Sequence, residues 1–214
     1  MVASRRDYVL NSVINQYKYE HYLEIGIGQA RKNFNKIRCK YKTGVDPRVK
    51  CDYQMTSDKF FKLIPSNKIY DLIYIDGDHS CSQVLKDVHN SLKHLDVNGL
   101  LVLHDVNPQY KEDQGKIGKG KFNTAWKAFA ILRMTRTDLY MCVVDIKHGA
   151  GIIKRGNQKL FPLVPNKKLT YEFLEKNKAE LLNLCSMKKF DELKNNSNLF
   201  NNQIKFSEDE KSIE

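Results

Sequence analysis

Residues 70–105 read YDLIYIDGDHSCSQVLKDVHNSLKHLDVNGLLVLHD. The first six, 70–75, form a β-rich run, and residues 80–95 carry apolar side chains at the spacing of one helix face. A second apolar run over 100–103 predicts another buried strand. A strand, a helix and a strand in this order are typical of an open sheet with parallel strands.

The rest of the chain continues this alternation. We expect further strands over 22–25, 42–45, 51–54, 139–144 and 151–154, and helices over 4–17, 29–38, between the cap at 56–58 and Pro65, and over 122–134 and 170–194. The predicted fold class is α/β: a Rossmann-like, open, mostly parallel seven-stranded sheet with helices on both faces and a C-terminal helical extension.

The composition excludes several classes of protein. No apolar run approaches the roughly 20 residues needed to cross a bilayer, and the N-terminal residues lack the apolar stretch of a secretory signal. The five cysteines are scattered and form no CxxC pair, which is typical of reduced intracellular thiols and not of a disulfide framework or a zinc site. We therefore expect a cytoplasmic protein with no membrane partner.

Positive charge is in excess and unevenly distributed. The chain has 36 Lys and Arg against 25 Asp and Glu, a net charge of +11, and residues 31–50 and 111–136 hold much of the excess. Such charge suits a nucleic acid, an anionic small substrate or a solvated surface. The basic segments contain no recognisable RNA-binding module and no regular interleaving of aromatic residues. Nucleic acid is therefore a partner that we consider but do not favour.

A glycine turn follows the first predicted strand. Glu24 precedes Gly26 and Gly28, whose missing side chains would let the backbone approach a ligand. The dinucleotide fingerprint would place a third glycine at position 31, where this chain has arginine, so a nicotinamide cofactor is disfavoured. Asp46 ends the next strand, where a carboxylate can accept both hydroxyls of a ribose. A tight turn without a ligand is the alternative.

These motifs, in this order, resemble class I S-adenosylmethionine-dependent methyltransferases. The glutamate and glycine turn followed by Asp46 is similar to the first two motifs of that family. The strings IDGDHS at 75–80 and NGLLVLHDV at 98–106 resemble the branch that methylates hydroxyl groups of sugars and small molecules. Cys81 departs from the tyrosine often found in this branch, which puts an aromatic acceptor contact there in doubt.

The resemblance covers about residues 20–155. It implies that the chain consists of two parts. Residues 1–160 would form the S-adenosylmethionine-binding methyltransferase domain together with an N-terminal helix. Residues 161–214 would form a C-terminal helical extension and a polar tail that we expect to be mobile. The long helix in this extension could pack on the core or support a homodimer.

The resemblance also implies roles for the cofactor residues. Gly26 and Gly28 would lie against the methionine part, with Glu24 organising the loop or meeting the amino group. Asp46 would hold the ribose. Ser57 and Asp58 would lie near the adenine. Asp76 and Gly77, directly after the strand over 70–75, complete the implied set of cofactor-binding residues.

Methyl transfer is an in-line displacement, so an enzyme mainly positions the acceptor and removes its proton. The candidate catalytic residues are His79, His104 and Asp105, at the ends of two neighbouring strands. In metal-dependent relatives, residues at corresponding positions bind Mg²⁺, which implies Asp76 and Asp105 as metal ligands. His104 weakens the magnesium inference or points to a softer metal, because Mg²⁺ prefers oxygen ligands. Two alternatives stay open: a divalent ion on the two carboxylates, or a metal-free histidine base.

Structural roles are alternatives for some of these residues. Asp78 could cap the following helix, His79 could be a hydrogen-bonded turn residue, and His104 could be a buried, satisfied histidine. The apolar set around Trp126 is expected to be core packing.

The function expected from the resemblance is O-methylation of a sugar, such as a nucleotide-sugar or glycan, or of another small hydroxylated acceptor. The Gly- and Lys-rich loop 111–121 would be a lid that meets an anionic acceptor, or else a solvated loop. The alternative functions are an RNA methyltransferase and a non-catalytic basic module that binds nucleic acid or protein.

Overall fold

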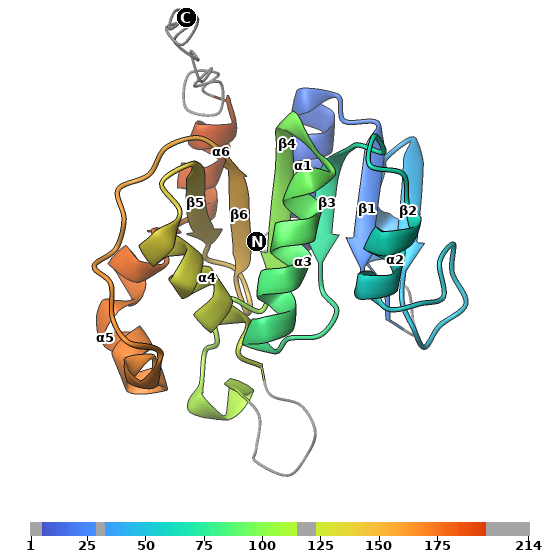
Figure 1. The fold of residues 1–214 in the computed structure, drawn as a ribbon. Helices are drawn as coiled ribbons and strands as arrows, with labels where there is room; N and C mark the ends of the chain where they lie inside the picture. The colour runs from blue at the N-terminus through green and yellow to red at the C-terminus, as the bar shows by residue number, and fades with distance from the viewer. Residues whose placement is uncertain (1–5, 29–32, 115–122, 196–214) are drawn as a thin grey trace, which may run out of the picture.

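The computed structural model describes residues 6–28, 33–114 and 123–195. Within these ranges one seven-stranded sheet has the order β2-β1-β3-β4-β6-β5-β7 (Figure 1). The strands are β1 His21–Ile25, β2 Tyr41–Val45, β3 Tyr70–Ile75, β4 Leu95–His104, β5 Leu139–Val144, β6 Ala150–Arg155 and β7 Leu184–Cys185. Neighbours pair in parallel, except that β6 is antiparallel to β4 and β5. The predicted mostly parallel sheet is confirmed.

Helices cover both faces of this sheet, as predicted. They are α1 Arg6–Tyr17, α2 Ser57–Leu63, α3 Cys81–Lys93, α4 Ala125–Thr135, α5 Tyr171–Leu181 and α6 Met187–Asn195, with short 3-10 turns η1 Phe34–Lys36, η2 Lys111–Gln114 and η3 Asn166–Lys168. Alternate strand residues face opposite sides. Leu23 and Ile73 join the core formed with α2 to α5, whereas Tyr22 and Leu72 join the core formed with α1 and α6. The apolar set Trp126, Phe129 and Leu132 lies in the first core, as predicted.

One predicted strand is wrong and another strand takes its place. Residues 51–54 form only a single bridge, between Val45 and Tyr53. The seventh strand is β7, which divides the helix predicted over 170–194 into α5 and α6. The break lies at Asn183, which adopts a left-handed backbone conformation (φ 45°) and whose side chain donates to the carbonyl oxygen of Met141 in β5 at 2.9 Å.

The helix predicted over 29–38 is also wrong where it can be judged. Residues 29–32 lie outside the described ranges, and 33–38 contain only the turn η1. The backbone after η1 is extended because it is hydrogen-bonded to the side chain of Asn11 in α1. This side chain donates to the carbonyl oxygen of Lys36 and accepts from the amide of Arg38. These bonds hold the backbone at Ile37 in an extended conformation, in which the Ile37 side chain is buried.

The segment after residue 160 packs on the core. Leu174 and Leu181 of α5 are fully buried, and so is Phe190 of α6. The guanidinium of Arg133 in α4 donates to the carbonyl oxygens of Glu180, Leu181 and Lys159 and to the side chain of Gln158. Residues 196–214 lie outside the described ranges. No helix in the described part of the chain is long and apolar enough to cross a membrane.

Candidate functional site

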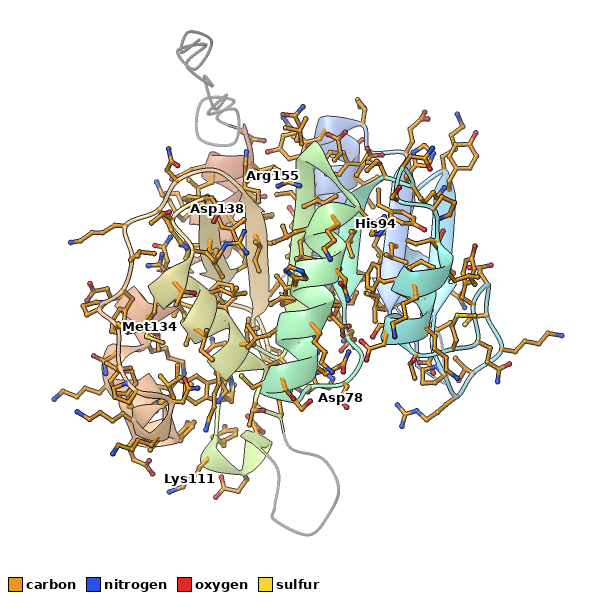
Figure 2. All side chains as sticks on the ribbon, in the orientation of Figure 1. Asp78, His94, Lys111, Met134, Asp138 and Arg155 are labelled. Carbon is orange, nitrogen blue, oxygen red and sulfur yellow. The ribbon has the colours of Figure 1, made fainter. Side chains whose placement is uncertain are left out.

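The largest concentration of predicted site residues lies at the carboxyl ends of β1, β2, β3 and β4. The chain passes from β1 to β2 on one side and then to β3 on the other, and such a switch point leaves a crevice between the following loops. Here it forms a cavity of about 720 Å³, which we call the strand-end cleft. Its lining includes the predicted residues Gly26, Gly28, Asp46, Ser57, Asp58, Asp76, Gly77, His79 and Asp105. In Figure 2, Asp78 marks this end of the sheet and Arg155 lies toward the opposite end.

The two glycines of the turn after β1 are needed for different reasons. Both have positive φ, +86° at Gly26 and +65° at Gly28. A Cβ atom on Gly26 would lie 2.3 Å from the carbonyl oxygen of Asp76 and 2.4 Å from the Cα of Gly77, so only glycine allows the two strand ends to meet. A Cβ atom on Gly28 would meet nothing within 4 Å. Gly28 therefore leaves space beside the backbone at the cleft.

Asp46 fixes the shape of the cleft wall after β2. Its Oδ2 accepts from the amide of Gly28 at 3.1 Å, and its Oδ1 accepts from the amide of Arg48 at 2.8 Å. Each carboxylate oxygen has a further lone pair. Asp46 can therefore accept hydroxyl groups from a ligand in the cleft while it holds the glycine turn.

Glu24 lies behind the cleft and does not line it. The carboxylate is buried and accepts from the Tyr22 hydroxyl at 2.5 Å and from the Asn33 amide at 3.1 Å. Burial raises the pKa of Glu24 to about 7, against the opposing effect of these two hydrogen bonds. This position suits the loop-organising half of the predicted role.

Gln83, on the first turns of α3, is a cleft residue that the sequence did not reveal. Its amide nitrogen donates to the Ser57 hydroxyl at 3.3 Å, to Asp58 at 3.1 Å and to the buried Asp87 at 3.0 Å. Burial raises the pKa of Asp87 to about 6. A glutamine within a helix gives no sequence signal of such a role, because only packing brings α3 against α2.

The structure brings together the residues predicted after β3 and β4. His104 Nδ1 lies 2.9 Å from Asp76 Oδ1 and 3.0 Å from Asp105 Oδ1. His79 Nδ1 lies 3.4 Å from Asp105 Oδ2. Arg6, which no sequence signal marked, places Nη1 2.7 Å from Asp76 Oδ2. We call these five residues the carboxylate–histidine cluster.

The two histidines of this cluster differ in environment. Burial alone would lower the pKa of His104, but hydrogen bonds to Asp105 and Asp76 and their negative charges outweigh burial and raise it to about 9. Burial alone would raise the pKa of Asp105, and the hydrogen bond and charge of His104 reverse this and lower it. His104 therefore carries a proton at neutral pH. His79 lines the cleft, which His104 does not.

The raised pKa of His104 should make the stability of the folded protein depend on pH. Because the pKa is about 9 when folded and about 6.5 when unfolded, protonation of His104 stabilises the fold fully below pH 6.5 and ceases to do so as pH rises through 9. Urea unfolding of the protein and of His104→Asn should therefore show a stability difference that shrinks by about 2–3 kcal/mol between pH 6 and pH 10. A difference that is constant with pH would show that folding does not raise the pKa of His104.

Comparison with known proteins identifies the first half of the chain. Residues 7–106 match a family model described as a methyltransferase domain. This segment is therefore similar to a methyltransferase domain. No curated protein matches the chain in sequence.

Solved structures share the fold of this chain at low identity. Cofactor-bound Rv0187 from MTB is 11% identical over 74% of this chain and 83% of its own, with a TM-score of 0.53. The S-adenosylhomocysteine-bound methyltransferase PaMTH1 from Podospora anserina is 13% identical over 73% and 80%, with a TM-score of 0.51. A presumed O-methyltransferase from Klebsiella pneumoniae is 14% identical over 74% and 82%, also at 0.51. The fold is that of class I methyltransferases.

A second cavity, of about 570 Å³, lies beyond the segment matched as a methyltransferase domain. We call it the side cavity, and it is lined by Gln109, Tyr110, Asp113, Asp145, Ile146, Lys147 and His148. Asp113 lines both cavities, so the side cavity adjoins the strand-end cleft. The ring of His148 lies 6.4 Å from that of His104. The sequence interpretation left His148 without a role, although it follows β5 as the other site residues follow their strands.

The other predictions near the cleft have mixed outcomes. Asp78 accepts from the amide of Ser80 at 2.7 Å and so forms a turn before α3, whose N-cap position is Ser80. In the basic loop, Lys111 forms an ion pair with Glu172 at 2.5 Å. The remaining lysines of that loop, at 116, 119 and 121, lie outside the described residues.

Proposed function

We propose that this protein is an S-adenosylmethionine-dependent O-methyltransferase with a small hydroxylated acceptor. The observation that carries the proposal is the placement of the glycine turn and Asp46 in one cleft with His79 and Asp105. Asp46, which we propose to bind the ribose, and His79, the proposed proton acceptor, thus line the same cavity. The solved methyltransferase with S-adenosylhomocysteine bound has the same fold, which supports the choice of cofactor.

The cofactor would occupy the strand-end cleft. Its ribose hydroxyls would donate to Asp46, and its methionine part would lie along the open backbone of Gly28. Ser57 and Asp58 would lie toward the adenine, held in place by Gln83. Bound in this way, the cofactor supplies an electrophilic methyl group.

His79 is the candidate general base. It is the histidine of the cluster that lines the cleft, and Asp105 lies within 3.4 Å of its Nδ1. Asp105 beside Nδ1, and Asp76 Oδ1 at 3.6 Å from Nε2, can stabilise the imidazolium that forms when the ring takes the acceptor proton. His104 already carries a proton and is placed to hold Asp105, not to remove a proton.

We infer that the acceptor hydroxyl approaches from the side cavity. Asp145, Gln109 and His148 offer polar partners there, and Tyr110 presents an exposed ring. Polar groups around one aromatic face suit a sugar ring, as in a nucleotide-sugar or glycan. A cytoplasmic location, a homodimer and the division of the chain at residue 160 stay predictions.

Cofactor binding can be tested without knowing the acceptor. Isothermal calorimetry should show one S-adenosylhomocysteine bound per chain, and Asp46→Ala should weaken the affinity by about 10- to 100-fold because ribose hydrogen bonds to a carboxylate are lost. Asp71→Ala is a matched control, since Asp71 pairs with His21 and the amides of residues 20 and 21 away from the cleft. No binding by folded wild-type protein would refute the proposed function.

A further inference from the structure

Arg6 joins the site from outside the segment that forms the cleft. It is the first residue of α1, and its Nη1 lies 2.7 Å from Asp76 Oδ2 and 3.2 Å from Nε2 of His104. The Tyr74 hydroxyl lies 3.4 Å from the same nitrogen. The guanidinium thus pairs with Asp76 and lies beside the Tyr74 hydroxyl and the His104 ring at the ends of β3 and β4.

The rest of α1 is firmly packed, so Arg6 is held in place. Val9, Leu10 and Val13 are fully buried against the second core. At the other end of α1, the Tyr17 hydroxyl donates to the carbonyl oxygen of Lys194 in α6. A long side chain that starts from an anchored helix loses less conformational entropy when it binds a carboxylate.

No carboxylate oxygen of the cluster is left open for a divalent metal ion. Each oxygen of the two candidate ligands faces a nitrogen. Asp76 Oδ1 faces His104 at 2.9 Å and its Oδ2 faces Arg6 at 2.7 Å, while Asp105 Oδ1 faces His104 at 3.0 Å and its Oδ2 faces His79 at 3.4 Å. Mg²⁺ demands near-octahedral oxygen ligands at about 2.1 Å. In the described ranges, no group of three or more His, Cys, Asp or Glu side chains is arranged to hold a metal.

Charge leads to the same conclusion. Two adjacent carboxylates at the end of a sheet need a nearby positive charge, because like charges in a partly buried site repel. Arg6 supplies one positive charge whatever the protonation state of the histidines, and it cannot lose its proton. Its side chain is 37% exposed and that of Asp76 17%, so the pair is partly desolvated.

We propose that Arg6 is the resident cation of this site: it takes the position on Asp76 that a divalent ion would need, and the protein transfers methyl groups without a metal. Arg6 acts as a positioning residue, through Asp76 and His104, and keeps Asp105 free to orient His79. The transfer step that follows rests on the proposed function, whereas the exclusion of metal from the cluster does not.

The test compares the full chain with Arg6→Gln, Arg6→Lys and Arg136→Gln. The last is a matched control, because Arg136 forms an ion pair with Asp138 on the protein surface, away from the cluster. Mn²⁺ is the probe, since its binding can be followed by electron paramagnetic resonance without an acceptor. Wild type, Arg6→Lys and Arg136→Gln should show no binding below about 1 mM, and Arg6→Gln should bind at least about tenfold more tightly because Asp76 Oδ2 is uncovered.

Activity provides a second readout once an acceptor is found. EDTA should leave the wild-type rate unchanged within about twofold, and Arg6→Gln should lower kcat by about 100-fold with the S-adenosylmethionine KM within about threefold. Arg6→Lys should recover at least about tenfold of that loss, which a merely structural role would not predict.

Different results would overturn the role of Arg6 and the proposed methyltransferase function. Micromolar Mn²⁺ binding by wild type, loss of wild-type activity in EDTA, or equal Mn²⁺ affinity of wild type and Arg6→Gln would each overturn the role of Arg6. Absence of S-adenosylhomocysteine binding would refute the proposed function and would leave the Mn²⁺ comparison valid.

Discussion

His79→Ala should reduce kcat of methyl transfer by about 10³-fold, with the affinity for S-adenosylhomocysteine within about threefold of wild type. The acceptor hydroxyl must lose its proton as the methyl group arrives, and His79 is the cluster histidine that lines the strand-end cleft. Asp105, 3.4 Å from its Nδ1, should behave as its partner, so Asp105→Asn should give a loss in the same direction. The cofactor contacts lie on other residues, so binding should survive.

His21→Ala is the matched control for this experiment. His21 is a histidine that lies within 3.6 Å of an aspartate, Asp71, at the start of β1 and far from the cleft. It should retain full activity. We also expect His104→Ala to lose transfer, because the proton that links Asp76 and Asp105 is lost with it. Full activity in His79→Ala, His104→Ala and Asp105→Asn would remove the assigned catalytic site.

Gly26→Ala should destabilise the protein by more than about 3 kcal/mol and abolish cofactor binding. Its Cβ would lie 2.3 Å from the carbonyl oxygen of Asp76, a backbone atom that cannot move without separating β1 from β3. The amide of Asp76 donates to the carbonyl oxygen of Ile25 at 2.8 Å, and that bond joins the same two strands. Separation of β1 from β3 should therefore also disrupt the strand ends that form the cleft.

The variant Gly28→Ala measures the cost of backbone strain without a steric clash. Gly28 has a similar positive φ, but its Cβ would enter open space. We expect a cost of about 1–2 kcal/mol from the left-handed conformation alone. Urea unfolding and calorimetry with S-adenosylhomocysteine should rank wild type above Gly28→Ala and both well above Gly26→Ala. Equal stabilities of the two variants would mean that the close approach at Gly26 is relieved by a small shift.

Local patterns in the sequence were sufficient for most of the fold. Strand patterns predicted β1, β2, β3, β5, β6 and the central part of β4. Helical spacing and capping signals predicted α1, α2, α3 and α4. These predictions succeed because the pattern of buried residues on one face is set by residues close together in the chain. The same holds for the glycine turn and Asp46, since a residue directly after a strand must lie at the sheet edge. These short-range signals also placed His79, His104 and Asp105 at the same sheet edge.

Only the tertiary structure determines which side chains form ion pairs and hydrogen bonds with those residues. Arg6 contacts Asp76 and His104 across 70 and 98 positions of sequence, and nothing near Arg6 in the chain signals that contact. The replacement of the 51–54 strand by β7 likewise depends on how Asn183 meets β5. The proton on His104 follows from two carboxylates brought within 3.0 Å by two different strands. Local burial and turn chemistry are properties of a sequence, whereas charge pairing between distant segments exists only once the strands and α1 have packed.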